Sequence, residues 1–133
     1  MTRVARCCCQ ACSVEVVGEP TLNAACHCSS CKRRTGSAFG WSAYFRNEDI
    51  KARQGEFSLY VVKGPPITRR WFCATCGTTM LWENDDFAPG GQTGFAGGCF
   101  ADTPLPEPNL SAHDNLRCAW LALPETWTRL SPP

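Results

Sequence analysis

The feature that most constrains this chain is its eleven cysteines in only 133 residues. Cysteine is this abundant in two classes of small domain: secreted domains stapled by disulfides, and domains that bind metal ions. Here the count is odd, the spacings are C-x-C and C-x-x-C, and adjacent Cys7, Cys8 and Cys9 have poor geometry for bridging to one another. The pattern therefore favours metal binding over a disulfide framework.

Length and charge narrow the class of protein further. A chain of 133 residues is long enough to bury one core, and no linker divides it, so we expect a single domain over residues 1–133. The net charge of +1 provides no basic field for nucleic acid. The N-terminal MTRVARCCC lacks the apolar region of a signal peptide, and no stretch is long enough to span a membrane. We therefore expect a cytoplasmic protein that binds neither nucleic acid nor membrane; the sequence does not indicate its oligomeric state.

Short runs of β-branched and aromatic residues, closely flanked by Gly, Pro, Asn or Asp, predict a mainly β fold with little helix. The expected strands lie at 13–17, 38–45, 57–62, 68–72 and 78–82. One helical turn is expected within CSSCKRRTG (28–36), with Gly36 as its C-terminal stop. Composition predicts a surface loop over 84–94, and the Pro-rich segment over 102–109 is expected to cross the surface in extended form.

Two short-spaced cysteine pairs predict a closed metal site. Cys7 and Cys9 share one face of an extended segment, because side chains two residues apart in a strand point the same way. Cys73 and Cys76, in FCATCGT, form a knuckle in which Gly77 allows a turn with positive φ. Two such pairs supply the four sulfur ligands of a structural zinc ion, which would fasten the N-terminal strand to a distant hairpin.

A third group of cysteines lies within AACHCSSCKRRTG (24–36). Cys26 and Cys28 again share a face of an extended segment, and Cys31 follows at C-x-x-C spacing. Three protein ligands with one open position are the arrangement of a catalytic zinc ion. The three cations at 32–34 would partly offset the net negative charge of three thiolates on Zn²⁺ and attract an anionic substrate; the alternative is that they form an ordinary solvated turn.

The cysteines outside these groups have simpler interpretations. Cys12 alternates with valines on the presumed buried face and is expected in the core, and Cys8 has the same parity. The alternative is that Cys9 and Cys12 form the C-x-x-C half of the structural site. Cys99 and Cys118 are expected to be packing residues. The alternative is that one of them completes the three-cysteine group into a second closed site.

The histidines and tryptophans also need assignment. His27 lies between two predicted ligands and is expected to face away from them, in the core or at the surface. His113 is either structural or close enough to the metal to act as a base or ligand. Most of the tryptophans are expected in the core, and Trp41 is the one expected to wall a pocket.

Taken together, these motifs resemble the glutathione-dependent formaldehyde-activating enzyme family, also called the centromere protein V-type domain. That family reads C-x-C-G, then C-H-C-x-x-C-R/K-R-x-x-G, then F-C-x-x-C-G-T, a G-S-L-D-like strand, and H-I…W near its end. The resemblance covers about residues 5–124. The corresponding segments here are CCCQ (7–10), CHCSSCKRRTG (26–36), FCATCGT (72–78), GGCFAD (97–102) and HDNLRCAW (113–120).

The resemblance implies a β-tent fold, in which two or three antiparallel sheets are organised around zinc sites. It also implies two zinc ions per chain, a structural one and a catalytic one, held by the two cysteine sets inferred from spacing. The chain departs from the family at Gln10, which replaces a glycine, at Cys12, which replaces a valine, and at Asp114, which replaces an isoleucine. Cys99 lies near the family's serine. None of these departures removes a predicted ligand.

The activity that the resemblance implies is carbon–sulfur lyase chemistry, in which glutathione adds to formaldehyde to give S-hydroxymethylglutathione. A thiol that enters the open position is deprotonated by the metal, and the thiolate is the nucleophile. Arg33 and Arg34 would bind the carboxylates of glutathione, and His113 would relay the proton. The partners are thus a small-molecule thiol and an aldehyde.

Two other functions remain open. The chain is alternatively a non-enzymatic, zinc-stabilised β scaffold that binds a protein or peptide. A metal or redox sensor is the third possibility, suggested by the four cysteines outside the predicted metal sites.

Overall fold

The computed structural model describes residues 1–65, 67–84 and 90–132. In these residues the strands are β1 (Thr2–Arg6), β2 (Ser13–Val17), β3 (Leu22–Cys26), β4 (Gly40–Arg46), β5 (Ile50–Gln54), β6 (Phe57–Val62), β7 (Thr68–Cys73), β8 (Thr79–Asn84), β9 (Gln92–Ala96), β10 (Leu110–Ala112) and β11 (Thr128–Leu130). The helices of the described residues are α1 (Ser29–Thr35) and the short 3₁₀ turns η1 (Asn47–Asp49), η2 (Gly97–Phe100) and η3 (Asp114–Leu116). The expectation of a mainly β fold with little helix is confirmed.

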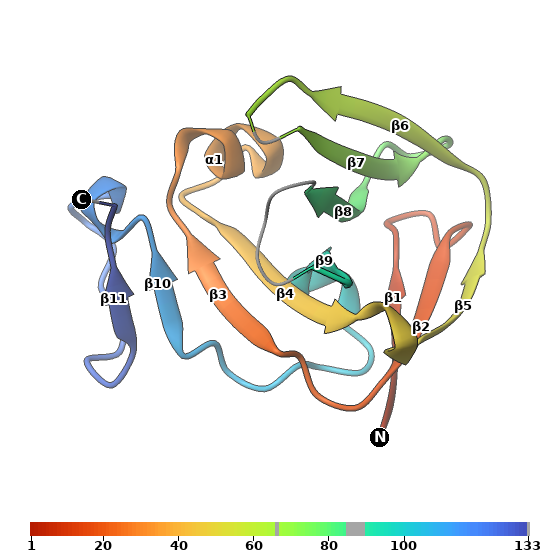
Figure 1. Cartoon of the computed structure of the whole chain (residues 1–133), viewed down its shortest axis with the longest axis horizontal. Coiled ribbons are helices and arrows are strands. Elements are labelled where there is room, and N and C mark those ends of the chain that lie inside the picture. Colours follow the sequence, from red (N-terminus) through yellow and green to blue (C-terminus); the bar gives the residue numbers. More distant parts are fainter. Residues whose placement is uncertain (66, 85–89, 133) are drawn as a thin grey trace.

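The described strands form two sheets. The smaller sheet has the order β1-β2-β5, and the larger one has the order β11-β10-β3-β4-β9-β8-β7-β6. Figure 1 shows the larger sheet curling from β3 round to β6, with β1 and β2 of the smaller sheet beside the opening. Because of this curl, residues from β3, β4, β7 and β8 face a shared interior.

The edge of the larger sheet differs from the antiparallel arrangement that the resemblance implies. Strand β10 pairs in parallel with β3 on one side and with β11 on the other. The reason is the connection: after η2 the chain returns along an extended segment and runs beside β3 in the same direction, which a tight hairpin cannot do. This crossover brings the segment after β10 to the end of β3.

Most of the expected elements form where local patterns predict them. Strands β2 and β6 match their expected bounds, and β4, β7 and β8 lie within two residues of theirs. Helix α1 ends at Gly36, whose left-handed φ of 63° lets its N–H donate to Lys32 O at 2.8 Å. Of the loop expected over 84–94, residues 85–89 lie outside the described part of the chain, and β9 begins at Gln92.

The core lies between the two sheets. Phe45, Phe95 and Phe100 form its centre, with ring centroids 5.7 to 5.8 Å apart. Val14 from β2 packs into the same cluster. Each fully buried side chain of this size contributes about 1.5–3 kcal/mol relative to an exposed one. Leu105 also reaches this core, so the segment 102–109 is extended as expected but anchored by one buried side chain rather than lying wholly on the surface.

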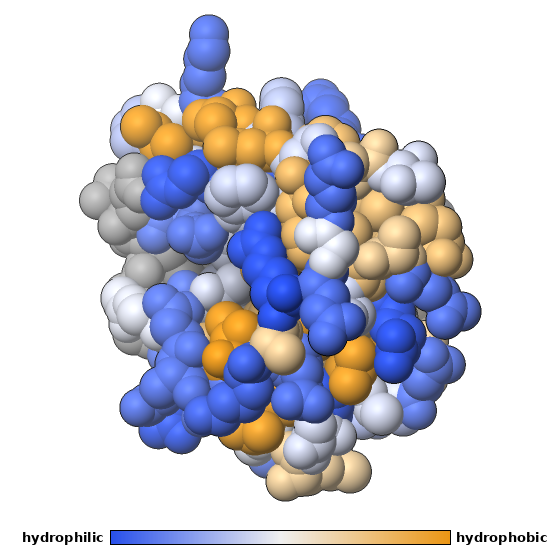
Figure 2. All heavy atoms as spheres, turned by 90° about the vertical axis from the view of Figure 1, so that its right-hand side faces the viewer, coloured by the Kyte–Doolittle hydropathy of each residue, from blue (hydrophilic) through white to orange (hydrophobic). Residues whose placement is uncertain are grey.

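The outer edge of the smaller sheet is polar. Strand β5 is exposed over most of its length and carries Lys51 and Arg53. Figure 2 shows the face on this side of the molecule as largely hydrophilic, with separate hydrophobic patches. Charged side chains on an edge strand oppose its pairing with other chains. None of the helices in the described ranges has the length and apolar character needed to cross a membrane.

Candidate metal centres and the adjoining cavity

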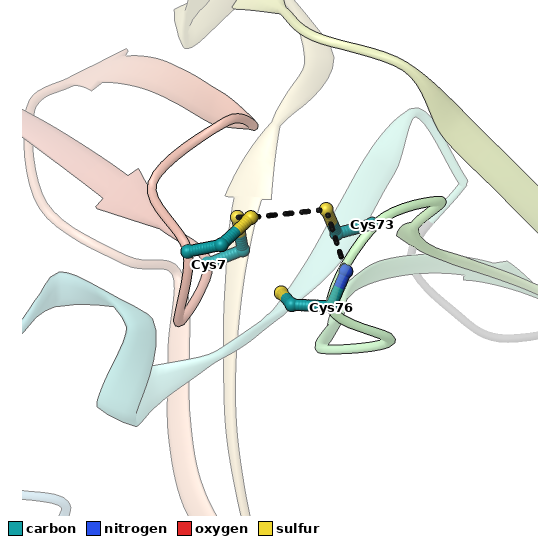
Figure 3. A group of neighbouring side chains, drawn as sticks. Cys7, Cys73 and Cys76 are labelled. Atoms are coloured by element: carbon teal, nitrogen blue, oxygen red, sulfur yellow. Dashed lines mark hydrogen bonds between the residues drawn. The ribbon is translucent and has the colours of Figure 1, made fainter.

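The first candidate metal centre joins two hairpins. Cys7 and Cys9 lie in the turn between β1 and β2, whereas Cys73 is the last residue of β7 and Cys76 lies in the turn that leads to β8. The four sulfur atoms all lie within 4.8 Å of one another. The Sγ atoms of Cys7 and Cys9 are 3.6 Å apart, and those of Cys9 and Cys73 are 3.7 Å apart. Figure 3 shows the sulfurs converging from the two hairpins.

Backbone N–H groups surround the sulfurs of this centre. Cys12 N donates to Cys7 Sγ at 3.3 Å, and Cys76 N donates to Cys73 Sγ at 3.4 Å. The bond from Cys76 N lowers the pKa of the Cys73 thiol, and hydrogen bonds from Thr78 lower the pKa of Cys76 to about 5. Donated hydrogen bonds favour the thiolate, which is the form that binds metal.

The grouping expected from spacing is found, but the strand argument behind it is wrong. Cys7 and Cys9 belong to a hairpin turn, in which Gln10 N donates to Cys7 O at 3.0 Å. Gln10 adopts φ = 66°, the left-handed conformation that a glycine adopts more readily. The turn therefore forms despite the substitution. In the second hairpin Gly77 has φ = 81°, as the knuckle requires.

The second candidate centre lies where β3 passes into α1. Cys26 is the last residue of β3, Cys28 is the N-cap of α1, and Cys31 lies in its first turn. The extended geometry expected for the first two cysteines is found, because Cys28 is still extended, with φ = -66° and ψ = 157°. The three sulfur atoms lie within 4.8 Å of one another, and among the described residues no further His, Cys, Asp or Glu joins this group.

The local hydrogen bonds favour a thiolate at Cys28. Its Sγ accepts from Cys31 N at 3.3 Å. Hydrogen bonds from the side chains of Cys26 and Cys31 lower the pKa of Cys28, whereas the bonds to Cys28 and Cys31 raise that of Cys26.

A cavity of about 340 Å³ adjoins these three cysteines and is called the three-cysteine cavity below. Its volume suits a small molecule. The cavity lies inside the curl of the larger sheet, between the β3–α1 corner and strands β4, β7 and β8. The side chains that line this cavity include Cys26, Cys28, Cys31, Arg34, Tyr44, Arg70, Trp82, Asn84 and His113.

The three cations of the opening motif have three different environments. Lys32 turns away from the cysteines, and its Nζ donates to Leu116 O at 2.7 Å. Arg33 is exposed and lines a neighbouring depression of about 500 Å³. Arg34 lines the three-cysteine cavity, and its guanidinium carbon lies 4.4 Å from the centre of the Trp82 ring. Of these three cations, Arg34 therefore lies beside the candidate metal centre. Arg33 is solvated, as the alternative of an ordinary solvated turn predicts.

Arg34 occupies space that a neighbouring glycine leaves open. A Cβ on Gly40 would lie 2.5 Å from Arg34 Nη2 and 3.1 Å from Cys31 Cβ. Burial lowers the pKa of Arg34, while the nearby Cys31 thiolate acts in the opposite direction. Its positive charge thus partly compensates the three thiolates. Arg34 also lines a groove of about 750 Å³ on its other side, together with Trp41, which is a pocket wall as expected.

The two histidines lie in different environments. His27 is fully buried, with its ring centroid 5.8 Å from that of Phe39. Burial is the main reason that its pKa is lowered, so the ring is neutral. His113 has φ = 52° and lines the three-cysteine cavity, outside the group of three sulfurs. The core expectation for His27 is confirmed, and His113 is close to the cavity rather than only structural.

The remaining four cysteines lie outside both groups. Cys12 is fully buried, as expected, and its Sγ donates to Glu56 O at 3.2 Å. Cys8 is exposed and belongs to neither group of predicted ligands. Cys99 packs against the core and lines the 750 Å³ groove, whereas Cys118 lies half-buried in the turn after η3. Neither supplies a fourth sulfur to the three-cysteine group.

Several cavity residues have no signal in the sequence that could have identified them. Tyr44, Arg70 and Trp82 stand in three separate strands, within ordinary strand patterns. Arg70 Nη2 donates to Ser30 Oγ at 2.7 Å and so ties β7 to α1. Trp120 also differs from expectation, because it is 76% exposed rather than in the core.

Both centres have the donor chemistry of a zinc site. Thiolate sulfur is a preferred ligand of Zn²⁺, and sets of three or four such ligands are common. Four mutually close sulfurs form a closed site, and three form a site with a position left for another ligand. The residues present therefore fit two metal ions of this kind.

Comparison with known proteins points to the same regions. A sequence model of the glutathione-dependent formaldehyde-activating enzyme family matches residues 2–114, which include both cysteine groups and His113. A protein of Colletotrichum graminicola, to which the name glutathione-dependent formaldehyde-activating enzyme is provisionally given, is 32% identical over 77 residues. That match covers 56% of this chain and 40% of the relative, so the chain spans less than half of that protein's length.

Proposed function

Because this chain belongs to the glutathione-dependent formaldehyde-activating enzyme family, we propose that it is a zinc-dependent carbon–sulfur lyase. It would add a thiol such as glutathione to a small aldehyde such as formaldehyde, or catalyse the reverse reaction. The observation that carries this proposal is the group of three sulfurs within 4.8 Å of one another beside a 340 Å³ cavity. A closed four-ligand group would leave no place for a thiol.

Each cysteine group has a distinct role in this proposal. Cys7, Cys9, Cys73 and Cys76 hold a structural zinc ion, and Cys26, Cys28 and Cys31 hold the second one. When bound, a zinc ion at the second site lowers the pKa of a thiol ligand and so supplies a thiolate nucleophile at neutral pH. Eleven cysteines without a disulfide fit a reducing compartment, for which we propose the cytoplasm.

The chain's own residues then bind the substrate and handle its proton. Arg34 offsets the negative charge of the thiolates and favours an anionic substrate in the cavity. Arg33, on the exposed side of the same helix, is the candidate for a carboxylate of glutathione outside the cavity. His113, which lines the cavity, would accept the proton of the thiol and pass it on.

The test combines metal analysis with a rate. The wild type should hold two zinc ions and accelerate formation of S-hydroxymethylglutathione, measured by NMR exchange, above the uncatalysed rate. Cys28→Ser should retain one zinc ion and lose the acceleration. Cys118→Ser, in a half-buried cysteine outside both groups, should behave as the wild type. A wild-type rate equal to the uncatalysed rate would refute the enzyme proposal.

One observation favours the alternative of a binding scaffold. Strand β6 is an edge of the larger sheet, and Leu59, Tyr60 and Val61 on it are 43%, 58% and 45% exposed. An exposed apolar edge strand can pair with a peptide. If the wild type binds two zinc ions but shows neither catalysis nor glutathione binding, the scaffold function is the better one.

A further inference from the structure

Tyr44 lines the three-cysteine cavity together with the cysteines of the candidate metal centre. It belongs to β4, which lies between β3 and β9, and its side chain is 7% exposed. Burial is the main reason that the pKa of Tyr44 is raised, and the hydrogen bond from Trp82 acts in the opposite direction. The phenol is therefore a buried polar group in the cavity that a thiol ligand of the candidate centre would enter.

Two neighbouring groups fix the orientation of the hydroxyl. Trp82 Nε1 donates to Tyr44 Oη at 3.0 Å, and Asn84 Nδ2 donates to the same oxygen at 3.4 Å. Both neighbours are donors, so the oxygen of Tyr44 is the acceptor in both bonds. The O–H of Tyr44 is in turn a donor, and these two bonds restrict the directions in which it can donate.

The two donors are themselves held in place. Thr68 Oγ1 lies 2.6 Å from Asn84 Oδ1 and donates to it, which directs the amide nitrogen of Asn84 toward Tyr44. Arg34 lies over the face of Trp82, and its positive charge strengthens the indole N–H as a donor. A preorganised donor chain of this kind is the arrangement that stabilises a developing negative charge on oxygen.

The proposed reaction develops such a charge. The sulfur–carbon bond forms while the π bond of the aldehyde breaks, and its electron pair moves to the aldehyde oxygen. The proton that the thiol has lost ends on that oxygen, so the product is a hydroxymethyl thioether, and nothing is oxidised or reduced. On this basis, which rests on the proposed function, we propose that the Tyr44 hydroxyl is a catalytic residue that donates a hydrogen bond to the aldehyde oxygen.

The hydrogen bond can be tested without turnover. In the cobalt-substituted protein, absorbance reports the binding of 2-mercaptoethanol, which carries an oxygen, and of ethanethiol, which does not. The wild type should bind 2-mercaptoethanol about threefold to tenfold more tightly, the scale of one hydrogen bond. Tyr44→Phe should bind both thiols equally. The matched control is Tyr60→Phe, in an exposed tyrosine on β6, which should keep the wild-type preference.

Kinetics supply a second readout. Tyr44→Phe should lower kcat by about a hundredfold, as removal of one preorganised donor does, and leave KM for glutathione unchanged. If Tyr44→Phe does not fold, Trp82→Phe removes one of the two donors to the hydroxyl and should reduce the preference for 2-mercaptoethanol at least about twofold. An unchanged preference in either variant would overturn the role of Tyr44.

The outcomes separate this inference from the proposed function. If the wild type binds both thiols with equal affinity, the role of Tyr44 is refuted and thiol binding still stands. If the wild type binds neither thiol, the proposed function fails, and the inference that rests on it fails with it.

Discussion

At the residue scale, three glycines leave space in the interior of this protein for large neighbouring side chains. Gly94 accommodates the indole of Trp82, and a Cβ there would meet the ring directly. Gly97 does the same for Trp41, and Gly40 for Arg34. Two of these three glycines thus position groups of the three-cysteine cavity. Because the contacts involve rings and a guanidinium held by stacking, the cavity has little freedom to adjust.

Gly40 offers a direct test of this arrangement. Gly40→Ala should displace Arg34 from Trp82 and crowd Cys31, at a cost of about 1–3 kcal/mol in the free energy of unfolding. We expect the second zinc ion to be bound more weakly in this variant, measured as metal content after dialysis.

The control for Gly40→Ala is Gly98→Ala, since a Cβ at Gly98 meets nothing within 4 Å. That variant should retain both ions and the wild-type stability. Equal metal content in the two variants would show that the space beside Gly40 is not needed by the centre.

At the element scale, two hairpin turns matter more than any strand. The β1–β2 turn contributes Cys7 and Cys9 to the first candidate metal centre, and the β7–β8 hairpin contributes the other two cysteines. The four sulfurs bring a hairpin of the smaller sheet next to a hairpin of the larger one. A metal ion bound at this centre would cross-link the two sheets and add to the hydrophobic contacts between them.

The β1–β2 turn provides both a test of the first centre, at Cys9, and a matched control, at Cys8. Cys9→Ser removes one ligand of the first centre and should lower the free energy of unfolding by about 4 kcal/mol or more, because loss of a structural metal is among the most damaging changes. Cys8→Ser alters an exposed neighbour whose backbone N, not its side chain, donates to Thr78 Oγ1. Thermal unfolding should leave that variant close to the wild type. Similar melting temperatures for both variants would contradict a structural ion at this centre.

At the scale of the whole molecule, the two centres differ in the elements that they join. In the first, Cys7 and Cys73 are buried while Cys9 and Cys76 are exposed, whereas all three cysteines of the second are half-buried. The first centre links the two sheets, and the second lies at one corner of the larger sheet. Loss of metal should therefore have different consequences at each.

We expect a chelator to remove the two ions in two steps. The ion of the three-cysteine group should leave first, with loss of glutathione binding and little change in circular dichroism. Later removal of the ion of the four-cysteine group should unfold the β structure, because it separates the two hairpins. Metal release and circular dichroism followed in one titration provide the measurement. Unfolding during the first step would show that the structural ion is bound by the three-cysteine group, which would contradict our assignment.

The grouping of the cysteines and the positions of several strands follow from the sequence by itself. The cysteines group as their spacing predicts, because ligands two or three residues apart meet in almost any turn, and Gly77 and Gly36 mark the ends of their motifs. For the same reason the grouping is confirmed even where the strand geometry assumed for Cys7 and Cys9 is wrong. Short alternating runs such as 13–17 specify their strands locally.

Only the tertiary structure decided what faces the three cysteines. Tyr44, Trp82 and Arg70 come from strands far apart in the sequence, and His113 arrives through the parallel crossover beside β3. Their meeting depends on strand order, register and the curl of the sheet, which no local pattern encodes. The sequence determined which cysteines lie together, and the fold determined which residues a substrate in the cavity would meet.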